Sequence, residues 1–132
     1  MNALEEALYD KLAGATAVTD LVSTRIYRGM APQNAALPYL IIQLQGGGDD
    51  NWTPTESKSY VYSVRAVSQV STDEAGDIAE AVHTALHKQA LTVSGWENYW
   101  MAAIGDLEVV ETDPAGVRRW HRGQNYRIRL AQ

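Results

Sequence analysis

Residues 25–44 read RIYRGMAPQNAALPYLIIQL and decide the fold. Pro38 has no backbone N–H to donate to a sheet ladder, so it is tolerated at the first residue of a strand or on an edge strand. The aliphatic and β-branched run behind Pro38 supplies the strand, and Arg25-Ile26-Tyr27 predicts a brief extended segment before a polar loop. This stretch therefore predicts a sheet with one strand starting at Pro38.

The N-terminal residues have a helical pattern. Asn2 and Glu5 are spaced as an N-cap residue and its capping-box partner, and leucines then recur at helical spacing as far as Gly14. Thr16 is expected to cap a second, shorter helical turn. The apolar faces of both segments are small, so we expect them to pack on a sheet.

A third helix is predicted after Ser71, which with Glu74 forms another capping box. An apolar stripe at i, i+3, i+4 and i+7 spacing follows, and the opposite face, which carries His87 and Lys88, is expected in water. Gly76 lies next to the stripe and weakens the helix. This segment is the most strongly amphipathic helix in the sequence.

Alternating side chains predict further strands. Residues 57–68 place Tyr60 and Tyr62 on one face and alternate residues on the other, and the last strand turns Tyr126 inward against outward arginines. Residues 90–95 and 99–111 read as extended, and Asp113-Pro114-Ala115-Gly116 as a turn. Residues 46–55, which begin with three glycines, are expected to form a flexible acidic loop.

These elements predict an α+β fold, a mostly antiparallel sheet with two main helices packed on one face, in one domain spanning residues 1–132. The chain has no cysteine, which excludes disulfides and thiolate chemistry, and no secretory signal or long apolar run. We therefore expect a cytoplasmic product with no membrane association. The net charge of −5 argues against a free-standing nucleic-acid module.

The chemical motifs in the chain are incomplete. His83 and His87 lie four residues apart on a helix but lack the glutamate that zinc peptidases place after the first histidine, and His121 has no partner ligand. A small metal-dependent hydrolase that uses the helical pair is the alternative of a different class. The glycines at 46–48 lack the Lys-Ser/Thr end of a phosphate loop, and Asp49-Asp50-Asn51 does not match a calcium loop. No catalytic, cofactor-binding or metal-binding residue is predicted.

One basic group stands out in this acidic chain, and it is interleaved with aromatic residues between residues 118 and 129. It is either an exposed strand face balanced by nearby carboxylates or a contact surface, because arginine and tryptophan are enriched at interfaces. Trp52 and Trp120 each neighbour a turn and fit no core stripe. The candidate assembly-interface residues are Asp49, Asp50, Trp52, Arg118, Arg119, Trp120 and Arg122.

The order of these elements resembles the tail-terminator or tail-completion proteins of long-tailed bacteriophages of the siphophage type. The resemblance rests on the spacing from Ile26-Tyr27 to Leu37-Pro38-Tyr39, on Ala66-Val67-Ser68 before the helix, and on the turn at residues 113–116. It implies a structural protein, not an enzyme, that forms a ring, usually hexameric, on the head-proximal end of the tail tube.

The same resemblance implies partners and a place. The ring would stop tube elongation and form the joint to the neck proteins, as part of a virion assembled in the host cytoplasm. DNA would pass through it without specific binding. A neck or head-completion protein is the closest alternative function.

Overall fold

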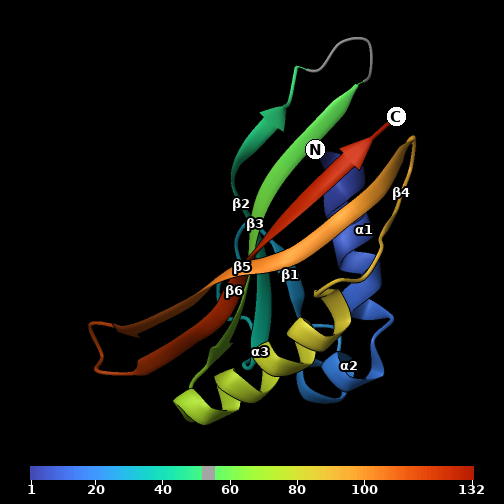
Figure 1. The fold of residues 1–132 in the computed structure, drawn as a ribbon. Coiled ribbons are helices and arrows are strands. Elements are labelled where there is room, and N and C mark those ends of the chain that lie inside the picture. Colours follow the sequence, from blue (N-terminus) through green and yellow to red (C-terminus); the bar gives the residue numbers. More distant parts are fainter. Residues whose placement is uncertain (52–55) are drawn as a thin grey trace.

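A computed structural model describes residues 1–51 and 56–132 (Figure 1). Its elements in chain order are α1 (Asn2–Ala13), α2 (Thr16–Val22), β1 (Ile26–Arg28), β2 (Tyr39–Asp49), β3 (Ser57–Ser68), α3 (Thr72–Leu86), β4 (Thr92–Val93), β5 (Trp96–Thr112) and β6 (Arg118–Ala131). The predicted α+β class is confirmed. The strand predicted from Pro38 begins one residue later, at Tyr39.

In the described part of the chain, six strands form one sheet in the order β1-β2-β3-β6-β5-β4. β1 pairs with β2 in parallel, and the other neighbouring strands of this sheet pair in antiparallel fashion. The predicted pairing of β2 with β3 is confirmed. β6 lies inside the sheet because it pairs with β5, its hairpin partner, on one side and with β3 on the other.

The helices lie together on one face of the sheet (Figure 1). Their apolar side chains and the inward residues of the strands form the main core, in which Leu4, Leu8, Tyr62, Ile78 and Tyr126 are fully buried. The opposite face carries a smaller cluster of Tyr39, Ile41 and Val67, covered in part by side chains from residues 27–37. The predicted alternation of β3 and β6 is therefore confirmed on both faces.

The helix ends differ from the predicted caps at two of three sites. Helix α1 begins at Asn2 itself, with Met1 in the N-cap position, and α2 begins at Thr16 with Ala15 before it; neither start has a side-chain cap bond. At α3, Ser71 does cap the helix, because the Glu74 N–H donates to its Oγ at 3.0 Å. The Glu74 carboxylate instead accepts from buried Ser68, at 2.9 Å.

The expectation of a flexible loop over residues 46–55 is wrong for its first part. Gly46 to Asp49 continue β2, after a bulge between Leu44 and Gly46. Gly47 has φ +115°, and a Cβ there would lie 2.2 Å from the Ser59 carbonyl oxygen, so glycine is required for this close pairing with β3. The three glycines therefore belong to a strand with an irregular backbone and not to a loop.

The hairpin of β5 and β6 extends away from the body of the protein (Figure 1). Strand β3 accompanies β6 only as far as the pair Ser68 and Trp120, so Arg118 and Arg119 lie beyond it. We call residues 105–124 the hairpin arm. No helix among the described residues is long and apolar enough to cross a membrane.

Candidate assembly surface on the hairpin arm

The candidate interface residues fall at opposite ends of the sheet. Asp49 and Asp50 lie beside Ser57, where β3 begins, and Arg118 and Arg119 lie beyond the end of β3 at Ser68. Twelve residues of strand separate the two groups, a length of about 40 Å. They therefore cannot form one contact patch on a single subunit.

At the acidic end, both aspartates have partners within the chain. Asp49 pairs with Lys58 at 3.0 Å, and Asp50 accepts from the Ser57 hydroxyl at 3.0 Å. Trp52, the third candidate here, lies outside the described residues. These two contacts connect the end of β2 to the start of β3.

At the tip of the hairpin arm, Asp113 builds the turn. Its Oδ1 accepts from the backbone N–H groups of Ala115 and Val117, both at 2.9 Å, which confirms the turn predicted from residues 113–116. Arg118 and Arg119 follow directly and are exposed. The turn thus presents two guanidinium groups at the end of the arm.

Carboxylates on β5 lie across from the arginines of the arm. The register sets Glu111 opposite Arg119 and Glu108 opposite Arg122, although no ion pair within 4.0 Å joins either pair among the described residues. The arm is therefore a mixed-charge surface rather than a purely basic one. Val109 and Val110 are about half exposed, at 52% and 53%, so it also carries apolar area.

Trp120 does not lie in the environment expected from the sequence. It is partly buried and packs against the main core, beside β3's last residue. The ring fills space at the base of the arm, because its position on β6 faces the helices in the same way as Tyr126 does. Trp120 thus belongs to the core's margin, and any interface role for it would involve only its exposed edge.

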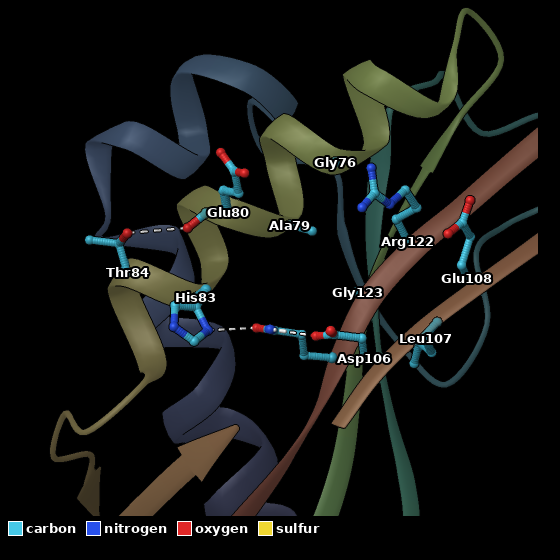
Figure 2. Close-up of a pocket in the computed structure, with 11 residues that line it drawn as sticks. Gly76, Ala79, Glu80, His83, Thr84, Asp106, Leu107, Glu108, Arg122 and Gly123 are labelled. Carbon is cyan, nitrogen blue, oxygen red and sulfur yellow. Dashed lines mark hydrogen bonds between the residues drawn. The ribbon is translucent and has the colours of Figure 1, made fainter. Parts of the chain in front are cut away.

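A groove of about 600 Å³ runs between α3 and the hairpin arm (Figure 2). Its walls carry Glu80 and His83 from α3, and Asp106, Glu108 and Arg122 from the arm. The Arg122 guanidinium lies against α3 at Gly76, where a Cβ would be only 2.5 Å from one of its nitrogens. Glycine in this helix therefore leaves room for the arginine.

Gln124 links the two walls of the groove. Its Oε1 accepts from His83 Nδ1 at 2.7 Å and from the Tyr126 hydroxyl at 2.9 Å, while its Nε2 donates to Asp106 at 2.8 Å. Because an amide oxygen only accepts, Nδ1 of His83 carries a proton. Burial raises the pKa of Tyr126, with a further contribution from Asp106, so its hydroxyl remains a donor.

His87 is not a solvated helix-face residue as the sequence suggested. Its Nδ1 accepts from the Ala103 backbone N–H at 3.1 Å, and its ring stacks on His83 with centroids 4.5 Å apart. An Nδ1 that accepts carries no proton, so His87 is neutral here. Loss of solvation, followed by the charges of His83 and Lys88, lowers its pKa.

These contacts give both imidazole rings of the helical pair a role in holding the fold together. Each histidine of the helical pair uses Nδ1 within the fold, and residues 1–51 and 56–132 contain no group of three His, Cys, Asp or Glu side chains placed to hold a metal ion. The arrangement fixes α3 to β6 through His83 and to β5 through His87. Sequence reasoning missed Gln124 and Asp106; Gly76 within an amphipathic helix was the available signal of a close approach.

His121 lies on the opposite face of the sheet, buried beside Val67. Its Nε2 contacts the Glu111 carboxylate, which bridges the two strands of the arm. Burial lowers the pKa of His121, and Glu111 opposes that effect only in part.

Comparison with protein families gave a match over nearly the whole chain. The sequence model for tail completion protein gp17 matches residues 6–131. The chain belongs to this family. Its members are structural phage proteins, so the predicted resemblance is confirmed and this tail completion protein has a structural role in tail assembly.

Comparison with solved structures gave the same fold. A chain in a structure titled "Virion of native gene transfer agent (GTA) particle" has a TM-score of 0.83 and 18% sequence identity, and the match covers 99% of this chain and 96% of that one. No match was found among curated proteins. This tail completion protein thus shares its fold with a chain of the gene transfer agent particle.

Proposed function

We propose that this tail completion protein closes the head-proximal end of the tail tube, stops tube elongation and forms the joint to the neck. The observation that carries the proposal is the family match over residues 6–131. We further propose that it acts as a ring, with six copies as the expected number. Neck or head-completion proteins would be its partners on one side, and the tube protein on the other.

The shape of the subunit supports this proposal. The sheet spans the molecule, and the two hairpins extend at its opposite ends (Figure 1). A subunit that must contact a tube at one end and a neck at the other needs two separate surfaces. The acidic end near Asp50 and the arm tip at Arg118 provide a pair of such surfaces with different charge.

The net charge also suits a ring around DNA. Six copies at −5 each sum to −30, and a negative lumen repels the phosphate backbone, so DNA would pass without adhering. This contribution requires that the carboxylates face the channel.

Particle morphology tests the proposal. Lysates of a particle-producing strain that lacks this gene are imaged by negative-stain electron microscopy. Tail lengths are measured, and particles with heads joined to tails are counted. Overlong tails without filled heads support termination. Tails of normal length beside unjoined heads would assign the protein to the neck, and normal infectious particles would contradict both functions. Re-expression of the intact gene, which should restore wild-type lengths and joining, is the control.

A further inference from the structure

One row of residues crosses the sheet from edge to edge with opposite charges at its two ends. The pairings connect Arg28 of β1 to Ile42, Val64, Gln124 and finally Asp106 of β5. Residues in register across a sheet point to the same face, so Arg28 and Asp106 both project on the helix side. Both are exposed.

The two strands that carry this row are open on their outer sides. β1 is the last strand at its end of the sheet, and β4 covers β5 only at Trp96 and Glu97. Further along β5, Met101 and Ala103 bond to Lys88 and His87, and beyond Ala103 the described pairings of β5 are with β6 alone. Residues 104–112 thus offer a strand edge with unpaired backbone groups.

We propose that this edge of β5 binds the β1 edge of a second copy, so that Arg28 of one subunit meets Asp106 of the next and the sheets join head to tail. The proposal rests on the ring proposed above and names the contact that builds it. A contact between two different surfaces of identical subunits repeats around an axis, and it closes into a ring when the rotation between neighbours divides a full turn evenly. β1 and β5 run in opposite directions within one subunit, so copies in the same orientation pair in antiparallel fashion.

Charge favours pairing of β5 with β1 of the neighbouring subunit over pairing of β5 with β5 of that subunit. The free segment of β5 carries Asp106, Glu108 and Glu111, so pairing it with itself would place carboxylates opposite one another. β1 itself carries Arg28 and no acid. Complementary charges at the same level of the sheet favour one partner and one register.

Because β1 is short, the charged side chains of the contact must help to fix its register. A strand of three residues makes few backbone hydrogen bonds, so strand pairing alone would leave the register between the two subunits poorly fixed. The ion pair between Arg28 and Asp106 would fix it. Exposed apolar side chains at Ile104, Val109 and Val110 lie on the same segment of β5 and would be covered by the neighbour.

Disulfide cross-linking tests the contact directly, because the natural chain has no cysteine. Arg28→Cys and Asp106→Cys are combined in one chain, and purified particles are oxidised and run on non-reducing gels. Within a subunit the two positions are four strand spacings apart, about 19 Å, so they cannot bridge each other. We expect a ladder of covalent multimers up to the full ring.

Two matched variants serve as controls. Arg28→Cys combined with Thr112→Cys places the second thiol six residues further along β5, about 20 Å away, and should remain monomeric. Asp106→Cys alone should also remain monomeric. Dimers from that single variant would show β5 paired with β5 and overturn the proposal, as would monomers only from the Arg28 and Asp106 pair in assembled particles.

Charge reversal gives an independent test if the cysteine pair does not enter particles. Asp106→Lys should reduce the number of particles with joined tails at least about tenfold, and adding Arg28→Asp should recover most of the loss. Asp106→Asn, which retains the acceptor for Gln124, separates loss of charge from loss of that hydrogen bond. A double variant no better than the single one would contradict the contact.

These results are distinguishable from a failure of the proposed function. If the deletion strain makes normal tails but the cysteine pair still forms multimers, the contact stands and termination does not. If tails are overlong in the deletion strain but no multimers form, termination stands and this contact is wrong.

Discussion

Nδ1 of His87 accepts a hydrogen bond from the backbone N–H of Ala103, which attaches the first residue after α3 to β5. The bond exists only while His87 is neutral, because a protonated ring has a donor at Nδ1. His83 stacks on the same ring and adds to the cost of charging it. The join between helix and sheet is therefore sensitive to protonation.

We predict that acid weakens the fold through His87. Its pKa is lowered on folding, so between that lowered value and about 6.5 the unfolded chain binds more protons and stability falls as the pH falls. His87→Asn keeps an acceptor near Nδ1 and should flatten this dependence, measured by urea unfolding at about pH 7.5 and about pH 5.5. His121→Asn is the control that keeps the His87 contribution. An unchanged slope in His87→Asn would exclude this source.

We predict that Gly123→Ala strongly destabilises the protein. A Cβ at this position would lie 2.1 Å from the Val64 carbonyl oxygen, inside the pairing of β3 with β6, so the backbone must shift. We expect a loss of about 3 kcal/mol in the free energy of unfolding. Gly105→Ala meets no atom within 4 Å and should change stability by less than about 0.5 kcal/mol. Equal effects of the two substitutions would contradict the steric argument.

Ser71→Ala should remove the N-cap of α3. The Glu74 N–H loses its acceptor at 3.0 Å, and a lost N-cap typically costs about 1 kcal/mol of stability. Thr16→Ala provides a matched change at α2, where the side chain makes no cap bond, and should be nearly neutral. Thermal unfolding of both variants measures the difference. A Thr16 effect as large as that of Ser71 would show that the cap bond is not responsible.

Arg118→Glu should impair particle assembly without affecting the fold. Arg118 is exposed at the tip of the arm and makes no ion pair within 4.0 Å among the described residues, so its loss should leave the melting temperature within about 1 °C of wild type. Joined particles are counted by microscopy. Lys88→Glu makes the same change in net charge on an exposed residue outside the arm, and should assemble normally. Normal assembly of Arg118→Glu would remove the arm tip from the interface.

Local patterns in the sequence were enough to predict most of the elements. Alternation at Tyr60, Tyr62 and Tyr126 gave the strand faces, and the stripe after Ser71 gave α3 and its cap, because side-chain periodicity and capping depend on neighbouring residues. The glycines at 46–48 misled because glycine in a bulged strand and glycine in a loop have the same local signature. Only the partner strand distinguishes the two.

The sequence by itself determined the α+β class, the strand that follows Pro38, the turn at Asp113 and the family resemblance. The tertiary structure alone decided that His83 and His87 bond to β6 and β5, that Trp120 packs on the core, and that Arg28 and Asp106 lie at opposite ends of one row. The physical reason is distance along the chain. Periodicity and capping act over a few residues, whereas these contacts join residues that only the order and register of the strands bring together.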